Sequence, residues 1–319
     1  MSSAPLRLGI VGTGRINDQL LAGARDSDRV RAVAIGSRDL ARSTSFAARH
    51  GIETAYGSYE ELLADPDVEA VYIPLPNALH HEWTMHALRA GKHVLVEKPY
   101  STDPAHVNEA YDLAESSGLV LMEAFMWRHG PGARLVRQLL PQVGAVRTIR
   151  TSFSFVIQDH VDVRMDLSLA GGSLMDVGCY TVSGARLVAG EEPVRVTGVA
   201  LWAPSGVDMH FHGQLEFASG AVAQIACGFD SERRGLEVVG ADGWFLLRDP
   251  WRNEPAGALL NGTPIDYEPE DLYRLELEDL VAAIRGEHPA LLGREDALGQ
   301  ARTLDALYRS ARSGAPVEL

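Results

Sequence analysis

The chain has 319 residues, of which 29 are basic and 43 acidic, giving a formal net charge of -14 at pH 7. Hydrophobic residues make up 46% of it, which excludes intrinsic disorder as its main state. Nucleic acids and anionic membrane surfaces attract positively charged proteins, so neither is an expected partner. At roughly 150 residues per domain, the length predicts about two domains.

Cysteine usage and hydropathy bear on the compartment. Cys179 and Cys227 form no CxxC pair, and the simplest interpretation is a reducing compartment with both thiols buried. No apolar run reaches the roughly 18 residues that a transmembrane helix needs. No apolar signal segment precedes the first predicted strand. We therefore expect a cytoplasmic protein without a membrane partner.

The first part of the chain alternates strand and helix signals. Apolar runs predict strands at residues 6–11, 30–36, 70–74, 93–96 and 119–124. Helices are expected at residues 15–25, after a cap at Asp39, after the Ser58-x-x-Glu61 capping box, after a cap at Asn77, and after Thr102 or Asp103. Such alternation predicts an α/β Rossmann domain with a doubly wound parallel sheet, covered by helices on both faces.

The pattern changes after about residue 145. Strands are predicted at residues 146–157, 194–202, 210–217, 222–229 and 244–247, and helices at residues 173–188, 272–285 and 295–313. Turn signals between the strands favour hairpins and hence a mostly antiparallel sheet, with one face open. The expected division is a nucleotide-binding domain at residues 1–124 and an α+β substrate-binding and oligomerisation domain at residues 125–319. Loops near residues 156–170 and 228–236 are expected to set specificity.

A glycine-rich turn follows the first predicted strand and opens the first helix. Its sequence is Gly12-Thr13-Gly14-Arg15-Ile16, with Asn17 at the third position of the G-x-G-x-x-G pattern. Such a turn lets the backbone approach a pyrophosphate, which the helix N-terminus also attracts. A glycine turn that binds nothing is the alternative, and the placement of the motif favours a dinucleotide site.

The end of the second strand indicates which dinucleotide is bound. Ser37 and Arg38 stand where an Asp or Glu would bind the ribose of NAD. A serine and an arginine suit a 2′-phosphate instead, which favours NADP. Asp39 follows directly, and NAD stays possible if this carboxylate binds the ribose rather than capping the next helix.

Three side chains from two places carry the predicted chemistry. Lys98 lies in Glu97-Lys98-Pro99 at the carboxyl end of the fifth strand, the edge where open α/β sheets bind ligands. Asp176 and Tyr180 follow Gly171-Gly172 and are four residues apart, so an α-helix would put them on one face. Without a catalytic role, Lys98 would be a surface charge, Asp176 a first-turn acid and Tyr180 a core residue.

These motifs together resemble the glucose–fructose oxidoreductase / inositol dehydrogenase (Gfo/Idh/MocA) family of NAD(P)-dependent oxidoreductases. The matching segments are Gly12 to Ile16, Tyr72 to Asn77 with His80, Glu97 to Pro99, Glu123 to Arg128, Asp162 to Arg164 and Gly171 to Tyr180. Two segments depart from the family pattern: Ala170-Gly171-Gly172 replaces three glycines, and Arg128-His129-Gly130-Pro131 replaces Arg-x-His-Pro.

The resemblance implies roles for individual residues. Lys98, Asp176 and Tyr180 form the catalytic group, and Arg164, Asp176 and Tyr180 bind substrate. Cofactor contacts are implied for the glycine turn, Ser37 and Arg38, and for Pro74, Leu75, Asn77, His80, Glu97 and Lys98. Tyrosine at position 180 is similar to the branch holding D-xylose dehydrogenase and trans-dihydrodiol dehydrogenase.

The expected reaction moves a hydride between the nicotinamide and a carbon that bears oxygen. Tyr180 can give or take the oxygen's proton, but its ordinary pKa near 10 requires a positive charge close by, which Lys98 can supply. Lys98 would also stabilise charge on that oxygen, while Asp176 orients substrate hydroxyls or the lysine. No metal is expected, because His81-Glu82-Trp83-Thr84-Met85 lacks the second histidine of a zinc helix.

The sequence therefore predicts an NADP-dependent oxidoreductase acting on a sugar or cyclic polyol, as an aldose dehydrogenase or ketosugar reductase. One alternative is a trans-dihydrodiol dehydrogenase. A second, of another class, is a regulator that senses NAD(P) without turnover, although such a protein has no need of the three catalytic residues together. The resemblance also implies a homo-oligomer, a dimer or tetramer, formed through the open sheet face.

Overall fold

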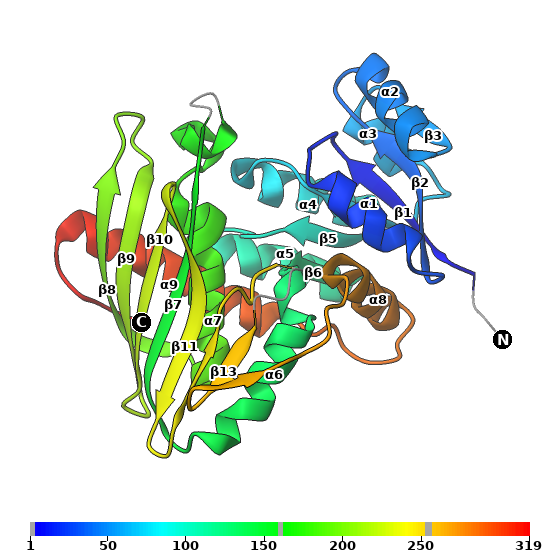
Figure 1. Cartoon of the computed structure of the whole chain (residues 1–319). Helices are drawn as coiled ribbons and strands as arrows, with labels where there is room; N and C mark the ends of the chain where they lie inside the picture. The colour runs from blue at the N-terminus through cyan, green and yellow to red at the C-terminus, as the bar shows by residue number, and fades with distance from the viewer. Residues whose placement is uncertain (1–3, 159–161, 253–256) are drawn as a thin grey trace. The chain divides into compact units, whose positions relative to one another are not determined.

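The computed structural model describes residues 4–158, 162–252 and 257–319 (Figure 1). The chain divides into two compact units. Unit 1 comprises Met1–His129 and Asp271–Ala297, and unit 2 comprises Gly130–Glu270 and Leu298–Leu319. In the described part of the chain, no helix combines the length and the apolar character that a membrane span requires.

Unit 1 is built on a parallel sheet of six strands in the order β3-β2-β1-β4-β5-β6. The strands are β1 (Leu6–Val11), β2 (Val30–Gly36), β3 (Thr54–Tyr56), β4 (Ala70–Ile73), β5 (His93–Glu97) and β6 (Leu121–Ala124). The strand order reverses between β1 and β4, where open α/β sheets bind their ligands. The predicted Rossmann sheet is confirmed; the short edge strand β3 was not predicted.

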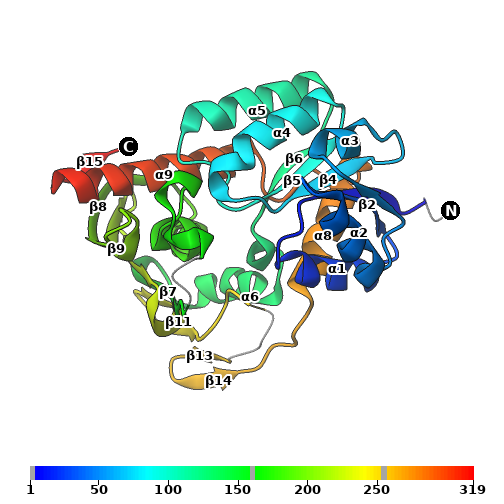
Figure 2. The ribbon, with the colours of Figure 1, turned by 90° about the horizontal axis from the view of Figure 1, so that it is seen from above.

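Helices cover this sheet, as Figure 2 shows from above. They are α1 (Asn17–Arg25), α2 (Leu40–His50), α3 (Tyr59–Ala64), α4 (His80–Arg89), α5 (Pro104–Ser116) and α8 (Leu272–Ile284). Asp39, Ser58 and Asp103 cap α2, α3 and α5 through their side chains, as predicted. The predicted cap at Asn77 is wrong, because Asn77–Leu79 forms a 3-10 turn and α4 begins only at His80.

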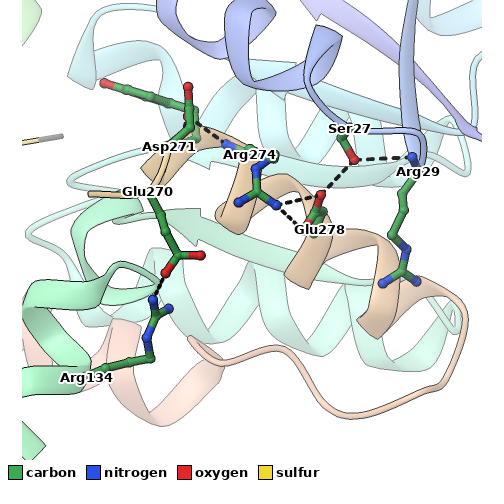
Figure 3. A network of polar contacts seen from close by, with 8 residues as sticks. Ser27, Arg29, Arg134, Glu270, Asp271, Arg274 and Glu278 are labelled. Atoms are coloured by element: carbon green, nitrogen blue, oxygen red, sulfur yellow. Dashed lines mark hydrogen bonds and ion pairs between the residues drawn. The ribbon is translucent and has the colours of Figure 1, made fainter. Parts of the chain in front are cut away.

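Helix α8, from the last fifth of the chain, belongs to unit 1 and packs mainly against α1. Ser27 donates to Glu278 at 3.0 Å, and Arg274 pairs with the same carboxylate at 3.0 Å (Figure 3). Figure 3 also draws the pair of Arg134 with Glu270, which belongs to unit 2. Residues 271–297 thus belong to unit 1, although the sequence assigns them to the second domain of residues 125–319, because α8 packs onto the nucleotide-binding fold.

Unit 2 is built on a nine-stranded sheet in the order β14-β13-β12-β11-β7-β10-β9-β8-β15. The strands are β7 (Val146–Val156), β8 (Pro193–Trp202), β9 (Asp208–Phe217), β10 (Val222–Gly228), β11 (Asp230–Gly240), β12 (Trp244–Leu247), β13 (Ala258–Leu260), β14 (Thr263–Ile265) and β15 (Val317–Glu318). The pairing is antiparallel except between β7 and β10. The predicted mostly antiparallel sheet is confirmed.

Strand β11 corrects the loop expected near residues 228–236. It pairs with β7 along its length and with β12 over Leu236–Val239. Its first half is Asp-Ser-Glu-Arg-Arg, whose charges hide the strand pattern, and apolar alternation begins only at Leu236. Of the other expected loop, residues 162–170 form short 3-10 turns, including Val163–Met165, and residues 159–161 lie outside the described residues.

Helices cover one face of this sheet. They include α6 (Pro131–Leu139), a π-helix (Leu174–Gly178), α7 (Cys179–Ala189) and α9 (Arg294–Ser313), whose first turn belongs to unit 1. Ile149, Phe211 and Leu236 are fully buried in the core on that side. On the other face, Val199 and Leu201 of β8 are 65% and 61% exposed.

Candidate functional site

The glycine turn after β1 forms a narrow backbone cradle. Gly12 has a φ of 100°, a left-handed conformation that favours glycine, and its N–H donates to the Gly36 carbonyl at 2.8 Å. A Cβ on Gly12 would lie 3.0 Å from Leu75. The Asn17 amide donates to the Gly12 carbonyl at 2.8 Å. Asn17 thus closes the turn with a hydrogen bond, at the position where the dinucleotide pattern usually has a small residue.

The carboxyl end of β2 presents polar groups beside this turn. Ser37 is 5% exposed and accepts from the Asp39 N–H at 3.3 Å. The carboxylate of Asp39 accepts from Ala41 N–H at 2.9 Å, so it caps α2 rather than reaching toward a ribose. Arg38 is exposed, and Arg42, one helical turn later, donates to the Thr13 hydroxyl at 3.4 Å. Two arginines thus follow β2 within one helical turn, and a contact of Arg38 with a 2′-phosphate stays a prediction.

His80 joins the segments that follow β4 and β5. It is fully buried, with Nδ1 2.9 Å from the Pro99 carbonyl and Nε2 2.7 Å from the Leu75 carbonyl. Burial lowers its pKa from 6.5 to about 4. The neutral ring has one N–H to donate to one of these carbonyls, and by lying between them His80 holds the predicted cofactor residue Leu75 close to the segment that carries Lys98. A direct cofactor contact by His80 stays a prediction.

Lys98 is half-buried at the end of β5, where a ligand at the strand ends could reach it. Its backbone N–H donates to the Glu97 carboxylate at 3.2 Å, and the Tyr72 hydroxyl donates to the same carboxylate at 2.6 Å. Glu97 is therefore occupied with anchoring the lysine segment to β4. Arg15 and Ile16 follow β1 and Pro74 follows β4, while Asn77 opens the 3-10 turn before α4.

Asp176 forms a charged cluster in unit 2. Arg164 donates from Nε to the Asp176 carboxylate at 2.6 Å and from Nη1 to both oxygens of Asp162 at 3.1 Å. The carboxylate of Asp176 raises the pKa of Arg164. An arginine at this distance favours the ionised form of Asp176. Arg164 and Asp176, both predicted to bind substrate, are thus brought together.

Tyr180 lies in the first turn of α7, after the π-helix that holds Asp176. Asp176 therefore lies in a π-helix and not in the α-helix that was expected, so the α-helical spacing does not apply between the two residues. That they share one face stays a prediction. Single π turns occur frequently at functional sites. Apart from the glycines that precede it, no residue pattern indicates this π turn.

Aromatic rings hold Tyr180 in place. The ring of Tyr180, 7% exposed, packs edge-on against Phe153 at 5.3 Å and Trp251 at 6.2 Å between centroids. Trp251 is fully buried and donates to the Ser152 carbonyl at 2.9 Å. A Cβ on Gly184 would lie 2.7 Å from the Trp251 ring, so a glycine one turn after Tyr180 permits this packing.

The predicted residues thus form two groups. Unit 1 holds the glycine turn, the β2 end and Lys98; unit 2 holds Asp176, Arg164 and Tyr180. The meeting of Lys98 with Tyr180 stays a prediction. Arg42 and Trp251 were not predicted. The spacing of four residues from Arg38 could have indicated Arg42, whereas nothing in the sequence around Tyr180 points to Trp251. Among the described residues, no group of His, Cys, Asp or Glu could hold a metal ion.

Family models match both halves of the chain. Residues 6–125 match the NAD-binding Rossmann fold of the GFO/IDH/MocA oxidoreductase family, and residues 134–246 match a GFO/IDH/MocA C-terminal domain. Among curated relatives, D-xylose 1-dehydrogenase (NADP(+)) 2 of Haloferax volcanii is 40% identical, covering 98% of this chain and all of that protein. The trans-1,2-dihydrobenzene-1,2-diol dehydrogenase of Sus scrofa is 36% identical over 77% of the chain and 75% of its own length.

Solved structures agree with this assignment. The aldose-aldose oxidoreductase of Caulobacter crescentus superposes with a TM-score of 0.90 at 29% identity, covering 99% of this chain and 100% of that chain. A 3-ketoreductase from Actinomadura kijaniata, solved with NADP and TDP-benzene, gives 0.89 at 31% identity over 98% of each chain. From the two matched domains and these relatives, we conclude that the chain is an oxidoreductase of the GFO/IDH/MocA family.

Proposed function

We propose that this protein is an NADP-dependent oxidoreductase that oxidises a hydroxyl of a pyranose sugar or cyclic polyol, or reduces the corresponding ketone. The observation that carries the proposal is the occurrence, in one chain, of the glycine turn after β1, of Ser37 and Arg38 after β2, and of the Asp176–Tyr180 segment. The resemblance over full length to an NADP-dependent D-xylose dehydrogenase supports the sugar substrate.

The residues of unit 1 fit a bound NADP. Because Leu75 lies so close to Gly12, position 12 has no room for a side chain, and only backbone is present at the turn. A pyrophosphate requires such a turn, since it must approach the backbone closely. Ser37, Arg38 and Arg42 offer a hydroxyl and two guanidinium groups to a 2′-phosphate, and the Asp39 carboxylate is occupied with its helix. When bound, the cofactor supplies or accepts the hydride.

Tyr180 moves the proton in this proposal. As the phenolate, Tyr180 takes the proton from the substrate hydroxyl during oxidation; as the phenol, it returns that proton during reduction. Lys98, at the end of β5, stabilises the developing charge on that oxygen and keeps the phenol's pKa low enough for transfer. Packing against Phe153 and Trp251 fixes the ring, so the hydroxyl keeps one orientation.

In this proposal Asp176 orients the substrate and does not transfer the proton. Its ion pair with Arg164 at 2.6 Å favours the ionised carboxylate, which can accept hydrogen bonds but has no proton to give. We infer that Asp176 and Arg164 together bind neighbouring hydroxyls of the substrate, the carboxylate as acceptor and the guanidinium as donor.

A substrate panel tests the proposal. Aldoses, ketosugars, inositols and cyclohexanediols are offered with NADP and NAD, or with the reduced cofactors for ketones, and nicotinamide absorbance is followed. We expect turnover of at least one sugar with preference for NADP. Cofactor binding without turnover of any polyol would contradict the proposal and favour a redox-sensing regulator.

A second candidate is a trans-dihydrodiol dehydrogenase. The resemblance to the Sus scrofa enzyme and the aromatic packing of Phe153 and Trp251 around Tyr180 favour it. Selective turnover of a cyclic diol next to an unsaturated ring, with none of the sugars, would establish this candidate in place of the first.

We further propose a homo-oligomer in which two copies pair through the open sheet face. Val199 and Leu201 alternate along β8 and point to that face, where they leave apolar surface exposed. A hollow of about 770 Å³ on the same face is lined by Ser152, Ala226 and Gly235, beside the Arg150–Glu237 pair. Cys179 and Cys227 are buried thiols outside any disulfide, which supports a reducing, cytoplasmic location.

A further inference from the structure

Asp208 is a buried carboxylate at the start of β9 with three donors. It is 1% exposed. Its Oδ2 accepts from the Ser173 hydroxyl and from the Leu174 N–H, both at 2.7 Å, and its Oδ1 accepts from the Tyr308 hydroxyl of α9 at 2.8 Å. Burial raises its pKa, while the donors act against that rise. Three donors on two oxygens fit an ionised group that only accepts.

The glycine segment before the π-helix is shaped around this carboxylate. Gly172 has a φ of 118°, and a Cβ there would lie 2.2 Å from Asp208 Oδ1. The carbonyl of Gly172 accepts from the Asp176 N–H at 3.0 Å. Glycine at position 172 therefore leaves room for the Asp208 carboxylate beside the backbone, in addition to forming a turn.

The two hydrogen bonds to Asp208 Oδ2 hold the beginning of the segment that contains Asp176 and Tyr180. The first N–H groups of a helix lack partners within it, and Ser173 makes no capping bond with its own side chain. Asp208, from a strand 34 residues further along the chain, accepts the Leu174 N–H instead. Asp176 lies two residues beyond Leu174, and Tyr180 follows in the first turn of α7.

We propose that Asp208 is a positioning residue for the reaction. Through Ser173 and Leu174 it fixes where the π-helix begins, and thereby where the Asp176 carboxylate and the Tyr180 hydroxyl point. It does not contact substrate. The inference rests on the proposed function, since it assumes that Asp176 and Tyr180 meet the substrate.

A matched pair of serine variants tests the inference. Ser173→Ala removes one donor to Asp208, whereas Ser310→Ala removes an equally buried hydroxyl that bonds Gly198 and Ala315 instead of Asp208. Small displacements of reacting groups lower rates steeply, so we expect Ser173→Ala to lower kcat about tenfold. The KM for NADP should stay unchanged, and Ser310→Ala should keep the parent kcat at a similar loss of Tm.

Asp208→Asn gives the stronger form of the test. Its amide nitrogen cannot accept from a donor, so we expect kcat to fall about 100-fold while the dissociation constant of NADP stays the same. If Asp208→Asn does not fold, the serine pair decides. Parent kcat in Ser173→Ala, or an equal loss of kcat in Ser310→Ala, would overturn the inference.

Tyr180→Phe, measured alongside, separates this inference from the proposed function. Loss of activity in Tyr180→Phe, with parent kcat in Ser173→Ala, would refute the positioning role alone. Full activity in Tyr180→Phe would refute the proton-transfer role on which the inference rests.

Discussion

Arg42 gives the cofactor site a residue-scale test. Its guanidinium contacts the glycine turn at Thr13, beside Ser37 and Arg38. A charge-assisted hydrogen bond contributes about 1.5–3 kcal/mol, so Arg42→Ala should weaken NADP binding by about 10-fold or more. NAD, which lacks the 2′-phosphate, should bind as before. Titration of both cofactors by fluorescence checks this, and an equal loss for NAD would show that Arg42 only supports the turn.

Glu276 predicts a pH effect on stability. It is fully buried, and among the described residues its carboxyl oxygens have no hydrogen-bond partner. Burial raises its pKa well above the usual value, and the charges of Glu97 and Asp279 add to the rise. Because the folded protein then holds a proton that the unfolded chain releases above pH ~4.5, stability is lost as pH rises toward the raised pKa, by about 1.4 kcal/mol per pKa unit.

Replacement of Glu276 should therefore remove this loss of stability at higher pH. Glu276→Gln is expected to be more stable than the parent at about pH 8, with a difference that shrinks toward about pH 5. Chemical unfolding across this range measures it. Glu278→Gln on the same helix is the control, because Glu278 is paired with Arg274 and should gain nothing. A difference that does not change with pH would contradict a raised pKa at Glu276.

At the scale of elements, α7 depends on the packing between Gly184 and Trp251. A Cβ at 184 would lie 2.7 Å from the indole ring, and overpacking of this kind costs about 1–3 kcal/mol. Gly184→Ala should therefore lower Tm and displace Tyr180, which lies one turn earlier. Gly132→Ala is the matched control, since a Cβ in α6 meets nothing nearer than 3.5 Å. Equal stability of the two variants would rule out tight packing at this point.

Elements with a local signal could be predicted from the sequence. Strands β1, β2, β4 and β5 are apolar runs, and Asp39 and Asp103 cap helices as expected. The strand β11 and the π-helix could not be predicted, because a charged half-strand and a change of helical spacing depend on tertiary neighbours. The same distinction holds for the candidate site. The glycine turn and the arginine after β2 could be predicted from local sequence, whereas Asp208 and Trp251 could not, because they contact the Tyr180 segment from distant parts of the sequence.

At the scale of the whole molecule, the open sheet face predicts self-association. Leu201 is 61% exposed on that face, and a carboxylate there would oppose burial of apolar surface between two copies. We expect the parent to have a mass of at least about twice the 34.6 kDa of one chain in light scattering, and Leu201→Asp to shift toward a monomer. Leu40→Asp, at an exposed leucine of unit 1, is the control. A monomeric parent would refute the proposed oligomer.

The proposed reaction depends most on the cooperation of Lys98 with Tyr180 in a single proton-transfer step. The most direct test is a comparison of kcat for Lys98→Ala, Tyr180→Phe and the double variant on the best sugar found in the panel. Groups that act as a unit show strongly non-additive losses, so the double variant should be about as slow as the slower single variant. Losses that multiply, or a Tyr180→Phe variant with the parent's kcat and pH profile, would contradict the account.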